Sequence, residues 1–376
     1  MKKPPVFHVD GERGLRGGER QLLYLAAALR ARGRRGVICA RADGELSSQA
    51  AHQGFEVRTY PFLGEWDPLT AARLAAAARR EGALLHAHTG HAAGVCALAS
   101  LSGARWLAHR RVDFPVSALS ARLKYGRAGA VVAVSGAIAK ILREAGVPNT
   151  KLSVAPDGIP ATAEECAWTG VDAARYRPPT PGEKAAYKAA LAEEFGLDAG
   201  APWVGNLAAL VPHKDHDTLL AAAVIVLLKR PDARVLIAGR GPEEARLSAS
   251  IRRMGLSGKV LLLGHRPDPV PLLKSLDVYA HSSWGEGMGS VLIEAAACGV
   301  PVAATSAGGI PEVVSGGETG LLVLPRHPEA LAEAILRLLA EPQLSARLAA
   351  AARARLPRFG LARMADSMEE LYDRLA

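Results

Sequence analysis

The sequence predicts an α/β protein built from two doubly wound parallel-sheet domains. Three observations lead to this fold class: short apolar runs alternate with amphipathic helical stretches, the alternation stops near the middle of the chain, and it then restarts. Strands that alternate with helices favour parallel βαβ units, in which helices cover both faces of a sheet. A length of 376 residues suits two such domains, since a domain commonly holds about 100–200 residues.

The first half contains a regular series of predicted strands. Val6–Val9 is expected to be the first, followed by a loop with four glycines and a helix over about residues 19–32. The later strands are expected at residues 35–40, 56–60, 84–88, 106–109, 130–135 and 152–155. Residues 160–202 lose the alternation and are rich in proline, so we interpret them as an interdomain connection containing one polar helix.

The second half repeats the pattern. Strands are expected at residues 203–207, 234–238, 259–263, 278–281 and 301–305, with a helix over 218–229. An amphipathic helix over residues 361–376 follows Pro357. We therefore expect an N-terminal domain over residues 1–178, a C-terminal domain over 179–356, and a terminal segment over 357–376. Doubly wound domains bind ligands at the carboxyl edges of their strands, so a ligand cleft between the domains is predicted.

The composition excludes several protein classes. Hydrophobic residues make up 49% of the chain, which argues against disorder, and no apolar run approaches the roughly 20 residues of a membrane helix. The four cysteines are far apart in the sequence and are expected to be buried free thiols. No apolar signal region follows the N-terminus, so we expect a cytoplasmic protein, with peripheral contact to the membrane face left open.

The positive charge is concentrated in the first half. Residues 1–178 hold 25 Lys and Arg against 15 Asp and Glu, whereas residues 179–376 hold 21 against 22. This asymmetry indicates an anionic partner for the first half. Nucleic acid is disfavoured, because aromatic residues are few and no nucleic-acid reader motif is present. A solvated basic surface without a binding role is the alternative.

The most informative motif runs from Ser283 to Gly299, after one predicted strand and into a helix. Gly287 and Gly289 allow the backbone to approach a ligand, and the free N–H groups of the new helix favour phosphate. Glu286 lies in the loop and Glu294 lies in the helix, where carboxylates can accept hydrogen bonds from sugar hydroxyls. Lys214 follows the strand at residues 203–207, from which an ammonium group can reach a diphosphate.

Three other motifs carry weaker indications. Asp215 and Asp217 form a DxD pattern at a helix start, where helix capping is the better explanation than metal binding. The segment at residues 239–241 lacks the third glycine of a dinucleotide fingerprint, which disfavours a nicotinamide dehydrogenase. His86 and His88 are expected on opposite faces of a strand, so that His88 alone would lie at the ligand edge.

These residues together resemble the retaining glycosyltransferases of family 4, which have the GT-B fold. The resemblance rests on the Glu286–x7–Glu294 pair within GEGMGSVLIEAAACGVPVAATSAGGIPEVV, and on AGRGPEE, LVPHKDHDTLL, GGERQLLYLAAAL, HAH and VAVS elsewhere. It implies a sugar transferase that uses a nucleotide diphosphate sugar and requires no metal ion or other cofactor. It also implies that the final helix crosses back onto the N-terminal domain.

The resemblance assigns roles residue by residue. Lys214 would meet the donor diphosphate, Glu286 the donor sugar and Glu294 the ribose. The remaining donor contacts would come from Gly17, Gly18, Gly239, Arg240, His265, Gly287, Met288, Gly289 and Ser290. The chain departs from the family at Ala209, where many relatives carry a second cationic residue for the diphosphate.

A second departure lies after the strand at residues 106–109. Relatives often have a catalytic histidine there, and in this chain His109, Arg110 and Arg111 share that position. His88, Arg110 and Arg111 are the expected acceptor contacts, and their charge suits an anionic glycan or lipid-linked saccharide of the cell envelope. Two alternatives stay open: a sugar-nucleotide epimerase on the same fold, and a basic protein with a vestigial site that binds nucleic acid or membranes.

Overall fold

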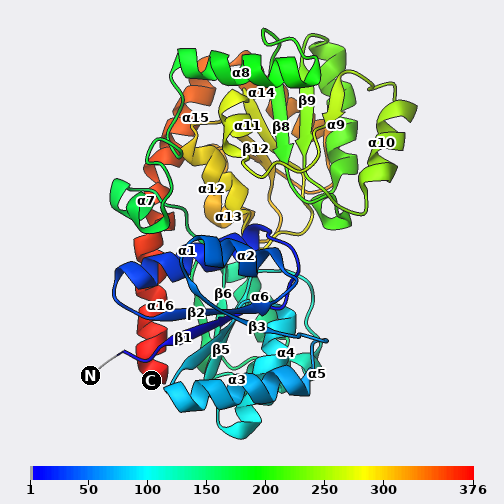
Figure 1. The fold of residues 1–376 in the computed structure, drawn as a ribbon. Coiled ribbons are helices and arrows are strands. Elements are labelled where there is room, and N and C mark those ends of the chain that lie inside the picture. Colours follow the sequence, from blue (N-terminus) through cyan, green and yellow to red (C-terminus); the bar gives the residue numbers. More distant parts are fainter. Residues whose placement is uncertain (1–2) are drawn as a thin grey trace. The chain divides into compact units, whose positions relative to one another are not determined.

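A computed structural model describes residues 3–376 and divides the chain into two compact units (Figure 1). Unit 1 contains the chain as far as Asp172 together with Phe359–Ala376, and unit 2 contains Ala173–Arg358. The division therefore falls a few residues before the boundary expected at residue 178. The chain leaves unit 1 once and returns to it for its last helix.

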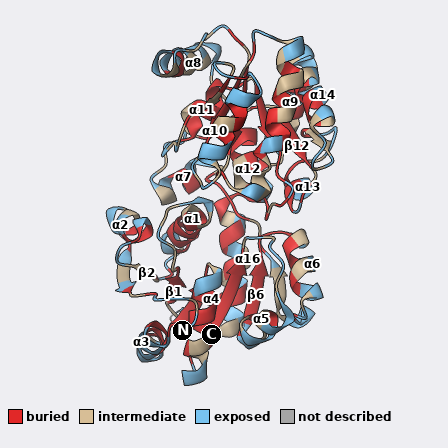
Figure 2. Cartoon of the chain, turned by 90° about the vertical axis from the view of Figure 1, so that its right-hand side faces the viewer, coloured by how far each residue is buried: buried red, intermediate tan, exposed pale blue. Residues whose placement is uncertain are grey.

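Unit 1 is built around a parallel seven-stranded sheet in the order β3-β2-β1-β4-β5-β6-β7. All neighbouring strands pair in parallel, in agreement with the βαβ pattern of the sequence. The strands are β1 (Val6–Val9), β2 (Gly36–Arg41), β3 (Glu56–Tyr60), β4 (Leu84–Ala87), β5 (Trp106–Arg110), β6 (Ala130–Ala133) and β7 (Leu152–Val154). Most of these strands are buried, as the red ribbons of Figure 2 show.

The helices of unit 1 connect these strands and cover the sheet. They are α1 (Gly17–Ala31), α2 (Glu45–His52), α3 (Pro68–Glu81), α4 (Gly90–Ala99), α5 (Ala118–Leu123), α6 (Gly136–Glu144), α7 (Ala163–Thr169) and α16 (Leu361–Leu375), with short 3-10 turns at Ser100–Ser102, Tyr125–Arg127 and Asn149–Lys151. The caps follow the sequence: Thr89, Ser117 and Ser135 each accept a backbone N–H bond in the first turn of their helices.

The final helix α16 packs on the core of unit 1 and runs beside α1 (Figure 1). Its buried face consists of Leu361, Met364, Ala365, Met368, Leu371 and Tyr372, which contact apolar residues of α1, β1, β4, β5 and β6. Burial of one large apolar side chain stabilises a fold by about 1.5–3 kcal/mol, so this face is a substantial part of the core. At the start of the helix, Glu165 of α7 accepts a bond from the amide of Ala362.

Unit 2 has a parallel six-stranded sheet in the order β10-β9-β8-β11-β12-β13. Its strands are β8 (Trp203–Leu207), β9 (Arg234–Ala238), β10 (Val260–Leu262), β11 (Val278–His281), β12 (Val302–Thr305) and β13 (Leu321–Val323). The sequence predicted all of these except β13, a three-residue edge strand that is only half-buried. Its periodicity was too short to separate it from a loop.

The helices of unit 2 surround this sheet. They are α8 (Pro181–Phe195), α9 (His216–Lys229), α10 (Glu244–Arg253), α11 (Val270–Ser275), α12 (Ser290–Ala297), α13 (Ile310–Val313), α14 (Pro328–Ala340) and α15 (Pro342–Ala354), with 3-10 turns at Pro212–Lys214 and Leu356–Phe359. Helices α9 and α14 pack against each other over a cluster of Leu, Ile, Val and Ala side chains. The connection expected at residues 160–202 contains two helices, α7 and α8, instead of one.

Two further expectations concern cysteines and membrane spans. All four cysteines are free and buried, as predicted. Within residues 3–376, no helix combines the length and the apolar character that crossing a bilayer requires.

Candidate active site

The order of strands in unit 2 places a ligand site at the ends of β8 and β11. The chain order of the strands reverses at this pair: β9 and β10 follow on the outer side of β8, and β12 and β13 follow on the outer side of β11. Doubly wound sheets bind ligands in the crevice at the carboxyl ends of such a pair. The loop after β8 carries Lys214, and the loop after β11 carries Glu286. The topology therefore brings together the two residues that the sequence singled out most strongly.

Lys214 and Glu286 form an ion pair in which Nζ lies 2.5 Å from Oε2. The same carboxylate oxygen lies 2.9 Å from Nε2 of His281, the last residue of β11. The hydroxyl of Ser283 lies 3.0 Å from the same His281 nitrogen, and Nδ1 of His281 lies 3.2 Å from the hydroxyl of Tyr279. This group places a cation, a carboxylate and an imidazole at one edge of the sheet.

The electrostatics of this group keep Glu286 ionised. Burial alone raises the pKa of the Glu286 carboxyl group, but the Lys214 ammonium and the hydrogen bond from His281 outweigh burial and hold this pKa well below its usual range. A buried carboxylate needs such partners, because an unpaired charge in the interior is costly. Glu286 is thus a fixed acceptor for hydroxyl groups.

Several backbone contacts hold the Glu286 loop in place. The amides of Trp284 and Gly285 donate to the carbonyl of His213, at 3.0 and 3.4 Å. The hydroxyl of Ser282 donates to the carbonyl of Lys214 at 2.9 Å. These bonds join the loops after β8 and β11, so the cation and the carboxylate sit on one rigid frame.

Helix α12 begins at Ser290, four residues after Glu286. Gly289 has a φ of +81°, a left-handed conformation that favours glycine, and Ser290 is the first helical residue. Met288 is buried beneath the turn. Glu294, inside the helix, is buried and accepts a bond of 3.3 Å from the hydroxyl of Tyr176. The Glu294 carboxylate thus has a protein partner, the Tyr176 hydroxyl, four residues into helix α12.

The remaining expected donor contacts lie at the same sheet edge. Gly239 follows β9, and a Cβ on this glycine would come within 1.8 Å of the carbonyl oxygen of Ala208. Glycine is therefore required for the close approach of two loops. Arg240 and His265, which follow β9 and β10, are both exposed. Asp215 caps helix α9 by accepting from the amide and hydroxyl of Thr218, in agreement with the capping interpretation of the DxD pattern.

The sheet of unit 1 has its own switch point, between β1 and β4. The loop after β1 leads to Gly17 and Gly18, the first residues of α1, and a Cβ on Gly18 would lie 3.9 Å from Cδ of Arg111. Asp10, at the end of β1, is buried, and burial together with the nearby Glu19 carboxylate raises the pKa of Asp10 to about 8.

The structure separates the three residues that share the position after β5. Arg110 is directed at Tyr125, with Nη1 donating to the Tyr125 hydroxyl at 3.0 Å and Nη2 donating to the carbonyl of Phe114. Arg111 instead contacts His88 and His109, with Nη1 and Nη2 each 3.2 Å from a ring Nδ1. His109 and Arg111 are therefore on one face of the sheet, and Arg110 is on the other.

The expectation that His86 and His88 point to opposite faces is wrong. Their ring centroids lie 3.8 Å apart, because residues two apart in an extended chain point to the same side. His8 of β1 and His109 of β5 join them, with ring centroids of His8 and His109 both 5.6 Å from that of His86. All four rings are buried.

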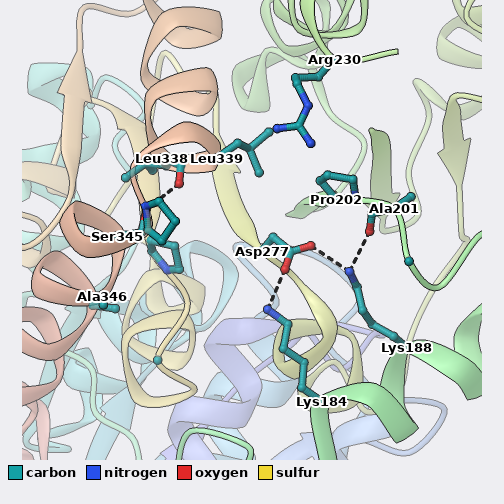
Figure 3. A pocket seen from close by; sticks show the side chains of 15 residues that line it. Lys184, Lys188, Ala201, Pro202, Arg230, Asp277, Leu338, Leu339, Ser345 and Ala346 are labelled. Carbon is teal, nitrogen blue, oxygen red and sulfur yellow. Dashed lines mark hydrogen bonds and ion pairs between the residues drawn. The ribbon is translucent and has the colours of Figure 1, made fainter. Parts of the chain in front are cut away.

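A separate cavity of about 430 Å³ opens at the amino ends of the strands of unit 2 (Figure 3). Lys184 and Lys188 both contact the carboxylate of Asp277 there, at 2.7 and 2.9 Å, and Lys188 also donates to the carbonyl of Ala201. Helices α9, α12 and α14 end at this edge of the sheet, and helix C-termini favour cations. Both lysines of this cavity are thus partnered by groups of the protein.

Some residues of both sites were not found from the sequence. His281 and Tyr176 in unit 2 and Asp157 in unit 1 each contact a predicted site residue. His281 carried a usable signal, because it is a polar residue at the carboxyl end of a buried strand. Tyr176 carried none, since its contact with Glu294 spans 118 residues of sequence.

Comparisons with known proteins agree with this architecture. A model described as Glycosyltransferase Family 4 matches residues 15–162, and one described as Glycosyl transferases group 1 matches residues 188–355. The Anabaena HepE protein, solved in complex with UDP and glucose, superposes with a TM-score of 0.85 at 25% identity, over 98% of this chain and 99% of that chain. Fold and site thus define a protein of the GT-B glycosyltransferase class.

Curated relatives point the same way. The GDP-mannose-dependent monoacylated α-(1-6)-phosphatidylinositol monomannoside mannosyltransferase of Corynebacterium glutamicum is 36% identical over 50% of this chain and 49% of its own length. The lipopolysaccharide core mannosyltransferase LpsB of Rhizobium meliloti is 30% identical over 66% of each chain. The chain spans about half the length of the first of these curated relatives. It belongs to the family 4-like glycosyltransferases with the GT-B fold.

Proposed function

We propose that this chain is a retaining, metal-independent glycosyltransferase that moves a sugar from a nucleotide diphosphate sugar to an anionic acceptor. The observation that carries the proposal is the Lys214–Glu286 pair at the switch point of unit 2, beside the amino end of helix α12. A fixed ammonium group suits a diphosphate, and an ionised carboxylate suits the hydroxyls of a sugar. The HepE complexes with UDP, glucose and UDP-glucose support the donor class.

The proposed step needs no base from the protein. The acceptor oxygen forms a bond to the anomeric carbon on the face from which the diphosphate leaves, and the bond from that carbon to the diphosphate oxygen breaks. The acceptor proton passes to the departing diphosphate, and the anomeric configuration is retained. Lys214 and the free amides at the start of α12 stabilise the charge that develops on the leaving group. These groups do the work that a metal ion would otherwise do.

The acceptor is proposed to be an anionic glycan or a lipid-linked saccharide of the cell envelope. The excess of positive charge in residues 1–178 supports this class, and so do relatives that act on lipopolysaccharide core and on phosphatidylinositol mannoside. A cytoplasmic location with peripheral contact to an anionic membrane face belongs to the same proposal, since basic residues near such a surface each contribute about 1 kcal/mol.

A panel of nucleotide sugars tests the donor class. A donor at 100 times its dissociation constant should stabilise the full chain by about 2.7 kcal/mol, which thermal unfolding detects. With the donor identified, transfer should continue in EDTA, and nuclear magnetic resonance of the first product should show the donor's anomeric configuration. Activity that is lost in EDTA and restored by Mn²⁺, or an inverted product, would contradict the mechanism. Conversion of the donor without any acceptor would instead indicate an epimerase.

A further inference from the structure

Four buried histidines meet on one face of the unit 1 sheet, at its carboxyl edge. His8 lies in β1, His86 lies in β4, His88 follows β4, and His109 lies in β5. The register explains the meeting, because His8 pairs with His86 across the two neighbouring strands, and Ala87 pairs with Ala108. These histidines belong to unit 1, whereas Lys214 and Glu286 belong to unit 2.

Arg111 determines where the protons of these rings lie. Its guanidinium group can only donate hydrogen bonds, so Nδ1 of His88 and Nδ1 of His109 must both be bare acceptors. Each ring is then neutral with its proton on Nε2. The Nε2–H of His88 donates to Nδ1 of His8 at 3.0 Å, so His8 is also neutral with its proton on Nε2. Burial lowers the pKa of all four histidines, in agreement with neutral rings.

A carboxylate completes the frame around Arg111. Nε of Arg111 donates to Oδ1 of Asp157 at 2.9 Å, and both side chains are more than nine-tenths buried. His88, His109 and Asp157 come from three different segments, so the plane of the guanidinium group is fixed from three directions. Each Nη carries a second N–H that these bonds do not use, and a Cβ on Gly18 at the start of α1 would lie 3.9 Å from Cδ of Arg111.

The last helix of the chain supports the same cluster. The hydroxyl of Tyr372 lies 2.7 Å from Nδ1 of His86, and both residues are fully buried. The His86 ring packs on His88 and lies almost parallel to His109, at an interplanar angle of 5°. Tyr372 thus limits how far the two rings that hold Arg111 can shift.

A metal ion is the competing explanation for this cluster. Ligand atoms of His8, His86 and His88 lie within 4.8 Å of one another. However, binding through Nε2 of His88 would move its proton to Nδ1, directly against the N–H of Arg111. The guanidinium charge would also repel a cation. The hydrogen-bond pattern therefore favours a neutral frame for an arginine over a metal centre.

We propose that Arg111 is the residue of unit 1 that binds a phosphate group of a substrate, and that His88 and His109 are positioning residues that act through it. The inference rests on the proposed function for the identity of the substrate, but not for the binding itself. Neither histidine acts as a general base, because the nitrogen that faces the guanidinium group already accepts a bond. Tyr372 positions the histidines through His86.

Binding of inorganic pyrophosphate to the full chain tests the role of Arg111 without any transfer assay. A Lys214→Ala background removes the cation of the donor site. In this background, Arg111→Gln should weaken pyrophosphate binding at least about tenfold in calorimetry, and Arg111→Lys should have an intermediate effect. The Arg111→Gln/Asp157→Asn double variant avoids a buried unpaired carboxylate and should bind as weakly as Arg111→Gln. Binding that is absent in the Lys214→Ala background, or that Arg111→Gln leaves intact, overturns the proposal.

Paired substitutions separate positioning from catalysis. In the His109→Asn variant, the side-chain amide oxygen can replace Nδ1 of His109 as the acceptor for Arg111. The His109→Leu variant has no such acceptor. His109→Asn should keep pyrophosphate binding within about threefold, while His109→Leu should lose as much as Arg111→Gln, and the two losses should not add. A general base would instead lose kcat equally in both variants and leave pyrophosphate binding unchanged, which would overturn the assignment.

Nitrogen-15 spectra of the histidine rings provide a direct readout. His88 and His109 should show bare Nδ1 and protonated Nε2 at every pH from 6 to 8. Protonation of either ring in this range, or the opposite tautomer, contradicts the proposal. One equivalent of Zn²⁺ should leave the ring signals unchanged, and stoichiometric shifts of His8, His86 and His88 would support a metal centre instead. Because no transfer is measured, these outcomes are distinct from a failure of the proposed function.

Discussion

Gly308 lies directly against the backbone of Glu286. A Cβ on Gly308 would stand 1.9 Å from the carbonyl oxygen of Glu286, and the neighbouring amide of Gly309 donates to that oxygen at 3.0 Å. The turn after β12 thus limits how closely the Glu286 loop can approach it. Gly308 therefore helps to fix the position of the charged residue Glu286.

The first prediction is that Gly308→Ala reduces transfer by displacing Glu286. Gly317→Ala is the matched control, because Gly317 also has a left-handed φ, of +77°, but a Cβ there meets no atom within 4 Å. Gly317→Ala should lose about 1–2 kcal/mol from backbone strain, measured by urea unfolding, and Gly308→Ala should lose more because its Cβ also meets the Glu286 carbonyl. Only Gly308→Ala should also lose activity by more than about tenfold. Equal activity of the two variants would show that the Glu286 loop tolerates displacement.

The second prediction concerns Lys214. Lys214→Ala should reduce kcat/KM by about 10²–10³, as removal of one preorganised charge-stabilising group does. The variant should still fold, but at a lower melting temperature, because the buried Glu286 carboxylate loses its cationic partner. Ala209 supplies no second cation, which is why the loss should be large. Lys229→Ala at the exposed end of α9 is the control and should be neutral. Unchanged turnover in a folded Lys214→Ala protein would mean that the diphosphate is bound elsewhere.

The third prediction is a loss of stability in mild acid. Burial lowers the pKa of His8 to about 3 from 6.5, and the pKa values of His86, His88 and His109 also lie below that value. Below pH 6.5 the unfolded chain therefore binds protons at these histidines that the folded chain does not bind. The free energy of unfolding thus falls as the pH falls. Each such group contributes a slope of about 1.4 kcal/mol per pH unit.

Urea unfolding between pH 5 and pH 8 measures this slope. His8→Asn should reduce this slope by about 1.4 kcal/mol per pH unit, the contribution of one proton. A slope that His8→Asn does not alter would mean that the cluster is protonated in the folded state.

The fourth prediction has the opposite sign and concerns Asp10. Its pKa is raised from 3.8 to about 8, mainly by burial. Between these values the unfolded chain has lost a proton that the folded chain keeps, so this carboxyl group makes stability fall as the pH rises from about 4 to 8. Asp10→Asn should remove this decline and raise the melting temperature at pH 8 relative to the native chain. An identical pH profile for both proteins would show that Asp10 is ionised in the folded state.

Most strands, and their alternation with helices along the chain, could be predicted from the sequence because they depend on local periodicity. Val6–Val9, Glu56–Tyr60 and Trp203–Leu207 begin and end where the apolar pattern does. Edge strand β13 could not be predicted, since three half-buried residues carry too little pattern. The charged residues Lys214 and Glu286 could be placed in one site because both follow strands that the parallel topology aligns.

The set of side chains around Arg111 in unit 1 could not be predicted in the same way. It joins Asp157, His88 and Tyr372, which are distant in sequence and lie in elements whose local patterns are ordinary. The choice among His109, Arg110 and Arg111 depended on which side each faces, and only the strand register decides that. Local periodicity gives the elements, but contacts between distant side chains require the folded chain.

The return of α16 to unit 1 sets an order for folding during synthesis. The residues from Leu361 to Tyr372 complete the core around β1 and β4, yet a ribosome releases them last. Unit 2 is contiguous, so it can fold while the end of the chain is still being made, whereas unit 1 must wait. A nascent chain stalled before residue 359 would therefore carry a finished second half and an incomplete first half, which chaperones would need to shield.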